Sequence, residues 1–119
     1  AVLLNILKAK IHQATVTDKE LHYDGSIVID QDFLEKTGII PGEKVDIANV
    51  NNGKRFSTYA IEGPRGSGQI GLRGAAAHLA EVGDKIIIFS YALMEEQQAK
   101  TFKSQKLYLE EGNKIKQCR

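Results

Sequence analysis

The chain has 119 residues, 42% of them apolar, which is enough for one compact domain and too little for two ordinary ones. Its 16 Lys and Arg residues nearly balance its 15 Asp and Glu residues, so no strong field indicates a nucleic acid or an anionic membrane as partner. Apolar runs such as Ile86–Phe89 have the length of a strand, far short of the ~20 residues of a membrane-spanning helix.

The remaining composition bounds the compartment and the metal chemistry. Cys118 is the only cysteine, which excludes an internal disulfide and fits a reducing compartment. Residues 1–4 lack the charged start of a signal peptide. The three histidines are scattered and form no zinc signature. We therefore expect a single cytoplasmic domain over residues 1–119 that binds no metal.

Two strands are predicted in the first part of the chain. Alternating apolar and polar residues over 6–12 predict a half-buried strand, with Lys10 and His12 on its polar face. A β-branched run then predicts a second strand, which opens at Ser26 directly after Gly25.

A short helix and a hairpin follow. Asp30 or Asp32 can cap the helix, and Gly38 ends it. Residues 45–50 and 55–61 are predicted to be hairpin strands, because the Asn-Gly dipeptide between them is a strong signal for a two-residue turn.

The second half repeats this pattern weakly. Glycine-rich residues 63–71 predict a loop, followed by a helix over 75–80 and a strand over 85–91. Residues 42–47 resemble residues 83–88, and each segment follows a short helix. Many short strands with two minor helices predict a mainly β fold, a closed β-barrel.

The end of the chain is more polar. Residues 95–106 are expected to be helical or irregular, and residues 107–109 to form an edge strand. Residues 110–119 are predicted to be solvated and frayed.

The reactive side chains do not by themselves distinguish an enzyme from a binding module. Arg55 and Tyr59 share one strand face, as Lys10 and His12 share another, and such pairs are more often solvated surface residues. A Gly-Ser dipeptide such as Gly25-Ser26 is also a common turn. The segments around these residues therefore decide the interpretation.

Four segments carry a resemblance to a known family. Residues 22–30 (HYDGSIVID) place Gly-Ser after a tyrosine and before a short strand, and residues 51–59 read NNGKRFSTY. The first resembles the processing site of the bacterial aspartate 1-decarboxylase family, and the second its Asn-Gly-(Lys/Glu)-Arg-Phe-Ser-Thr-Tyr motif. Lys10-Ile11-His12 and Gly74-Ala75-Ala76-Ala77 match further family segments, so the resemblance runs from about Leu3 to Met94.

The resemblance implies a double-psi β-barrel that assembles as a homotetramer with active sites between subunits. It implies a precursor that cuts itself between Gly25 and Ser26 into a β chain, residues 1–25, and an α chain, residues 26–119, in which about 95–119 form a variable tail. Ser26 becomes a pyruvoyl group, whose ketone forms a Schiff base with the substrate amine and replaces pyridoxal phosphate as electron sink. Some enteric relatives need a maturation factor for this step, so such a partner belongs to the expectation.

The implied reaction converts L-aspartate to β-alanine and CO2 for pantothenate and coenzyme A biosynthesis. Cleavage begins when the Ser26 Oγ attacks the carbonyl of Gly25, a residue that tolerates a strained backbone and does not crowd the attacking oxygen. By resemblance, Thr58 assists cleavage and Tyr59 donates a proton to the carbanion.

The resemblance also assigns the substrate contacts. Arg55 clamps a carboxylate with its planar fork, and Lys10 and His12 add positive charge for a dianionic substrate. Ala75 and Ala76 contribute backbone contacts.

Three positions depart from the family pattern. Ile27 stands where many members have Cys, and Asp24 stands where many have Glu. Arg73 stands where Asn is common, so a longer, charged donor lies near the processing segment.

Two other functions remain as alternatives. A short helix followed by Pro-Gly-Glu-Lys-Val at residues 41–45 also occurs in small swapped-hairpin DNA-binding regulators. The nearly balanced charge argues against that class, because such binding depends on neutralising phosphates. A catalytically inactive barrel, in which Ser26 is only a turn residue, is the second alternative.

Overall fold

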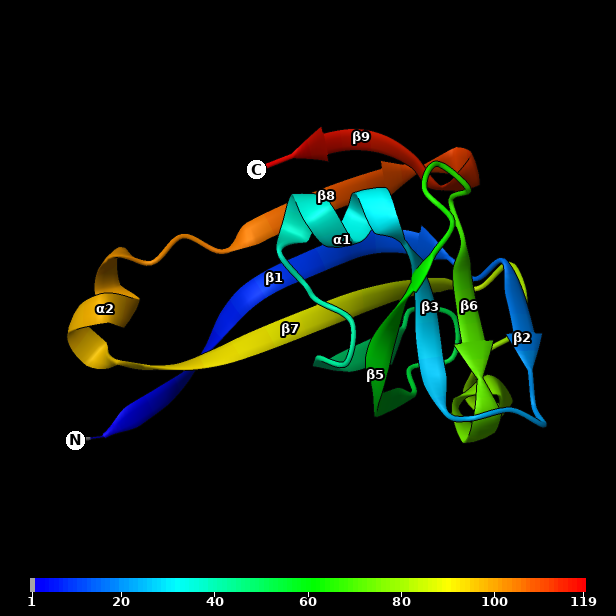
Figure 1. The fold of residues 1–119 in the computed structure, drawn as a ribbon, viewed down its shortest axis with the longest axis horizontal. Helices are drawn as coiled ribbons and strands as arrows, with labels where there is room; N and C mark the ends of the chain where they lie inside the picture. The colour runs from blue at the N-terminus through cyan, green and yellow to red at the C-terminus, as the bar shows by residue number, and fades with distance from the viewer. Residues whose placement is uncertain (1) are drawn as a thin grey trace.

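The computed structural model of the protein describes residues 2–119 (Figure 1). The strands of this region form one hydrogen-bonded sheet in the order β2-β6-β3-β5-β4-β7-β1-β8-β9. In chain order the elements are β1 (Leu3–Thr15), β2 (Asp18–Glu20), β3 (Ser26–Asp30), α1 (Gln31–Thr37), β4 (Lys44–Asn49), β5 (Arg55–Gly63), β6 (Ile70–Arg73), η1 (Gly74–Leu79), β7 (Lys85–Glu95), α2 (Glu96–Thr101), β8 (Gln105–Glu110), η2 (Glu111–Asn113) and β9 (Lys114–Cys118).

The sheet closes into a barrel because β1 and β2 are consecutive parts of one wall. At one end of the order β2 pairs with β6 in parallel, and further along β1 pairs with β7 antiparallel. Only Val16 and Thr17 separate β1 from β2. The Val16 N–H donates to the Asp84 carbonyl at 2.9 Å, and the Thr17 N–H donates to the Ile70 carbonyl at 2.9 Å. The ring β6-β3-β5-β4-β7-β1/β2 is thereby complete.

Branched aliphatic side chains fill the barrel. Every residue of β3 is buried, which explains why its sequence is continuously apolar between Ser26 and Asp30 and does not alternate. The fully buried side chains of the core include Ile11, Ile27, Ile29, Ile47, Ile70, Leu72, Ile86 and Ile88. Neighbouring strands such as β5 alternate instead, with one face outside the barrel.

The weak sequence repeat corresponds to a repeated arrangement of the backbone. The Gly42 N–H donates to the Ala60 carbonyl at 2.7 Å, and the Ala60 N–H donates to the Glu43 carbonyl at 2.9 Å. In the second copy, Gly83 and Asp84 make the same exchange with Val16, at 2.8 and 2.9 Å. Both turns therefore tie the strand that follows a short helix to the strand beside it.

Two connections are related by this repeat. Residues 21–25 lead from β2 to β3, and residues 64–69 lead from β5 to β6. β3 pairs in parallel with β5, and β6 pairs in parallel with β2. Each connection therefore crosses from one parallel pair to the other.

β1 and β7 are longer than predicted and continue beyond the barrel as a two-stranded ribbon, with α2 at its far end (Figure 1). The predicted helix over 75–80 is a 3-10 helix, η1. The predicted two-residue turn is longer, because the Asn49 N–H donates to the Lys54 carbonyl at 2.8 Å, so residues 50–53 form the loop.

The structure corrects two predictions about irregular segments. The glycine-rich loop is confirmed over residues 64–69, but Ile70 and Gly71 already belong to β6, and a further short strand, β2, pairs with it. The last residues are not frayed, because β9 pairs antiparallel with β8 and the Arg119 N–H donates to the Lys106 carbonyl at 2.7 Å. No helix within residues 2–119 is long and apolar enough to cross a membrane.

Candidate active site

Ser26 lies at the start of β3, where the connection from β2 enters the barrel. Its side chain is 2% exposed, whereas Gly25 before it is exposed. On one side of β3, the antiparallel pairing with β6 places Ser26 opposite Arg73. The peptide bond between Gly25 and Ser26 is therefore at the border between solvent and core.

On its other side, β3 is paired in parallel with β5. The register joins Ile27 to Ala60. One residue earlier on both strands, this register places Ser26 beside Tyr59. Two residues earlier, it places Gly25 beside Thr58. The structure thus brings the predicted processing residues together.

The side chains of β5 alternate as the sequence predicts. Arg55 and Tyr59 are exposed, the latter by 41%, while Thr58 is half-buried and Ala60 is buried. Arg55 and Tyr59 therefore share the outer face, and Thr58 points the other way.

Gly74 packs directly on the segment before Ser26. Its backbone has φ +73°, and a Cβ at this position would lie 2.7 Å from the Gly25 Cα and 2.9 Å from the Tyr23 carbonyl oxygen. Both distances are far below ordinary contact. Only glycine allows the backbone up to Gly25 to lie so close.

Ala75 and Ala76 follow Gly74 at the start of η1. Ala75 is exposed, and Ala76 packs partly against the core. Both therefore lie at the same end of the barrel as Gly25.

The basic candidates gather on another part of the outer surface. Lys10 on β1 is paired with Phe89 on β7. The Arg55 guanidinium carbon lies 5.5 Å from the centre of the Phe89 ring, a cation–π contact. His12 follows Lys10 on the same face of β1. Phe89, which sequence reasoning missed, thus lies beside both Lys10 and Arg55.

Within one chain, Lys10 and His12 do not lie on a strand next to Ser26. Their strand β1 pairs with β7 and β8, whereas β3 pairs with β5 and β6. In the closed ring, β6 separates β3 from the wall that β1 and β2 share. Periodicity in the sequence predicted their face correctly but carries no information on which wall of the barrel they occupy.

His12 is held in an unusual state. Burial, followed by the positive charge of Lys10, lowers the pKa of His12 below its usual value. Its Nδ1 is buried and has no hydrogen-bond partner within residues 2–119. Its ring meets the Tyr108 ring edge-on, with centroids 5.6 Å apart, because β8 pairs in parallel with β1. Tyr108 was not a predicted site residue, since nothing in the polar tail indicates this pairing.

A shallow hollow adjoins the processing residues. Its volume is about 310 Å³, and it is lined by Lys44, Ser57, Thr58 and Tyr59. Lys44 is paired with Tyr59 across β4 and β5, and it is a cationic neighbour that sequence reasoning missed. An anionic substrate placed here would contact Lys44 and the Tyr59 phenol together.

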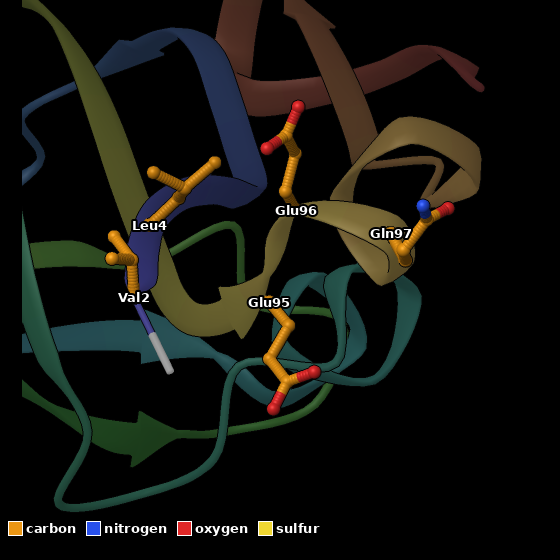
Figure 2. Close-up of a pocket in the computed structure, with 5 residues that line it drawn as sticks. All are labelled: Val2, Leu4, Glu95, Glu96 and Gln97. Atoms are coloured by element: carbon orange, nitrogen blue, oxygen red, sulfur yellow. The ribbon is translucent and has the colours of Figure 1, made fainter.

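A second hollow, of about 260 Å³, lies at the far end of the β1–β7 ribbon and is lined by Val2, Leu4, Glu95, Glu96 and Gln97 (Figure 2). It contains none of the predicted site residues. Within residues 2–119, no three His, Cys, Asp or Glu side chains come together as metal ligands would.

Comparison with known proteins decides the family. A sequence profile described as aspartate decarboxylase matches residues 2–116. The chain belongs to the aspartate decarboxylase family. The prediction from the sequence motifs is thereby confirmed, and with it the prediction of an enzyme of the carboxy-lyase class.

The relatives of this aspartate decarboxylase family member cover nearly all of it. The aspartate 1-decarboxylase of Carboxydothermus hydrogenoformans is 54% identical over 114 residues, which are 96% of this chain and 90% of the relative. That of Maricaulis maris is 54% identical over 112 residues, 94% of this chain and 93% of the relative.

A solved structure supports the fold. The crystal structure of the rationally designed protein mkDPBB_sym_86, a double-psi β-barrel design, matches with a TM-score of 0.50 at 17% identity and covers 66% of this chain and 92% of the design. The predicted double-psi β-barrel is confirmed.

Proposed function

We propose that this protein decarboxylates L-aspartate to β-alanine and CO2, after it has cut itself between Gly25 and Ser26. The observation that carries the proposal is the placement of Ser26 beside Tyr59, with Gly25 packed on Gly74 and level with Thr58. Family membership supports the reaction, which serves pantothenate and coenzyme A biosynthesis in this family.

Self-cleavage starts at the buried hydroxyl. The Ser26 Oγ attacks the Gly25 carbonyl carbon, the C–N bond breaks, and an ester replaces the amide. Loss of the Ser26 Cα proton then expels the Gly25 carboxylate and leaves dehydroalanine. This residue tautomerises and takes up water, releases ammonia, and becomes a pyruvoyl group at the new N-terminus. Thr58 lies level with Gly25 in the register of β3 and β5, and its hydroxyl assists this step.

The surroundings of residue 26 fit a pyruvoyl group. After the cut, residue 26 remains at the end of β3, held by the pairings with β6 and β5 and shielded from solvent. The pyruvoyl group supplies the electron sink for loss of the substrate α-carboxylate. The Tyr59 phenol, on the strand beside it, delivers the proton that completes β-alanine.

The substrate contacts come from more than one part of the surface. Arg55 binds a carboxylate through its fork, and Ala75 and Ala76 offer backbone groups next to Gly74. Lys10 and His12 lie on β1, which does not pair with the strand of Ser26 in the same chain. We propose that they act at the Ser26 site of a neighbouring subunit, in a homotetramer.

Exposed apolar side chains support such an assembly. Leu3, Tyr91 and Leu93 are 53%, 36% and 66% exposed along the β1–β7 ribbon. A second copy covering this ribbon would remove them from water. We further propose a cytoplasmic location, and a maturation factor as partner if the purified chain cuts slowly.

Intact mass spectrometry tests self-cleavage. The purified protein should give two chains, of 25 and 94 residues, with Ser26 converted. Ser26→Ala should block both the cut and decarboxylase activity. Ser67→Ala is the matched control, because Gly66-Ser67 is the chain's other Gly-Ser dipeptide in the connection related by the repeat. A wild-type chain that stays whole and never gains activity would indicate the inactive barrel instead.

Mixing two inactive variants tests the shared site. Ser26→Ala lacks the cofactor, and Lys10→Met lacks the cation, so each should be inactive alone. If the site lies between subunits, oligomers reassembled from both should regain part of the wild-type activity. No gain in activity after verified subunit exchange would show that Lys10 does not act at the Ser26 site of a neighbouring subunit.

A further inference from the structure

The segment before the scissile bond begins and ends on either side of Arg73. In the parallel pairing of β2 with β6, Arg73 is paired with Glu20, the last residue of β2. In the antiparallel pairing of β3 with β6, it is paired with Ser26. The connection over residues 21–25 therefore crosses the end of β6 at Arg73.

The Arg73 side chain lies against this connection and not in solvent. Its Nη1 is 2.7 Å from the Asp18 Oδ2, and only 16% of the side chain is exposed. Its guanidinium carbon is 6.0 Å from the centre of the Tyr23 ring, within the range of a cation–π contact. Arg73 thus joins the connection over residues 21–25, through Tyr23, to strand β2, through Asp18.

The neighbouring residues are adapted to this ion pair. A Cβ at Gly71 would lie 2.6 Å from the Asp18 Oδ2 and 2.9 Å from the Arg73 Nη1, so the pair occupies the space that any other residue would fill. The Thr17 hydroxyl donates to the Asp18 Oδ1 at 2.7 Å, and the Gln69 amide donates to it at 3.3 Å. Burial alone would raise the pKa of Asp18, but these hydrogen bonds and Arg73 lower it overall, so the carboxylate stays charged.

We propose that Arg73 is a positioning residue for self-cleavage: it holds Tyr23, and through Tyr23 the backbone up to Gly25, against Gly74. The inference rests on the proposed function. The inference gives a physical reason for Arg at position 73, where Asn is common in the family. The short neutral side chain of Asn could not span from Asp18 to the Tyr23 ring. The planar guanidinium can face the ring and pair with the carboxylate at once.

Four variants measure the effect on the cut. Arg73→Met keeps the apolar stem and loses the charge, and Arg73→Asn introduces the common family residue. Tyr23→Leu removes the ring, whereas Tyr23→Phe keeps it. Freshly synthesised precursor is followed by intact mass against time, and the melting temperature of each variant verifies its fold. Tyr23 is 64% exposed, so its replacement tests the contact even if an Arg73 variant fails to fold.

The matched control is on the same strand. Lys19, next to Asp18 on β2, pairs with Glu81 at 2.7 Å and makes no contact with Tyr23 among the ion pairs and cation–π contacts of residues 2–119. Lys19→Met should cut at the wild-type rate.

We expect Arg73→Met, Arg73→Asn and Tyr23→Leu each to slow the cut by about tenfold or more, and Tyr23→Phe to restore the wild-type rate. Combining Arg73→Met with Tyr23→Leu should slow it no further, because both remove one contact. Wild-type cleavage rates in Arg73→Asn or Tyr23→Leu, or losses that multiply in the double variant, would overturn the positioning role of Arg73. They would leave the proposed self-cleavage standing. A wild-type precursor that never cuts would instead overturn the proposed processing and this inference with it.

Discussion

Replacing Gly74 by Ala separates backbone strain from a specific contact at the processing segment. Gly74 and Gly38 have nearly the same φ, +73° and +76°. An alanine in this left-handed region costs about 1 kcal/mol more than glycine. In a domain of this size this backbone cost alone should lower the melting temperature by about 4 °C in either variant.

The two sites differ in what surrounds the added methyl group. At Gly38 nothing lies within 4 Å, whereas at Gly74 the Cβ would be 2.7 Å from the Gly25 Cα. Carbon atoms prefer about 3.5 Å or more, so the two backbones must separate by roughly 0.8 Å. A misplacement of about 1 Å can slow a reaction by about 100-fold. We therefore expect Gly74→Ala to slow self-cleavage by about that factor, and Gly38→Ala to cut at the wild-type rate.

Intact mass of freshly made precursor, sampled over hours, gives both cleavage rates, and calorimetry gives both melting temperatures. The comparison holds strain constant, so the difference in cleavage rate reports the contact with Gly25. Equal cleavage rates in Gly74→Ala and Gly38→Ala would refute the argument that close packing at this point presents the carbonyl to Ser26.

Three further changes test other parts of the molecule. Tyr59→Phe should cut normally but lower kcat by about 100-fold, since it removes the proton donor; undiminished turnover would rule that role out. Burial alone would raise the pKa of Glu43, but hydrogen bonds from Lys8, Ser90 and the Ile40 N–H lower it overall. The ionised Glu43 carboxylate therefore stabilises the fold above pH 4.5, and this stabilisation is lost as the pH falls further. Glu43→Gln should have a lower free energy of unfolding at pH 7, and that free energy should change less with pH below 4.5. Identical acid unfolding curves for the variant and the wild type would contradict this. Asn113→Ala removes three partly buried hydrogen bonds, to both backbone groups of Thr15 and to the Gly68 carbonyl. It should lower the free energy of unfolding by about 3 kcal/mol in urea titrations, and a change below about 1 kcal/mol would show that water replaces these bonds.

Local signals in the sequence were sufficient where one residue determines a boundary. The start of β3 at Ser26 and the helix between Asp30 and Gly38 were predicted correctly. In α1 the Asp30 carboxylate accepts from the Asp32 N–H, and Gly38 takes the left-handed conformation that ends the helix. Such features depend on neighbours in the chain, so the sequence displays them directly.

Elements defined by distant partners were not predictable in this way. β2 has three polar residues, and β6 is a four-residue segment with an internal glycine, so neither shows the period of a strand. β2 is a strand because it pairs with β6, about fifty residues away, and β6 is a strand because it lies between β2 and β3. β9 is exposed throughout and pairs only with β8.

The same limit applies to the candidate site. The spacing of Arg55 and Tyr59 predicted their common face, but the contact between Gly25 and Gly74 depends on the order of strands in the barrel. The position of Lys10 relative to Ser26 depends on that order as well. Side-chain periodicity assigns a face, and only topology assigns a neighbour.

The two crossing connections place the two Gly-Ser steps of this protein in different surroundings. In the connection over residues 64–69, the Ser67 hydroxyl donates to the Pro64 carbonyl at 2.6 Å. The Asp30 carboxylate accepts from the N–H groups of Gly66 and Gly68, at 3.1 and 2.8 Å. That serine is committed to a closed turn, while its counterpart at position 26 enters a buried strand beside a tyrosine. The same Gly-Ser step therefore ends in a hydrogen-bonded turn in one connection and opens a buried strand in the other.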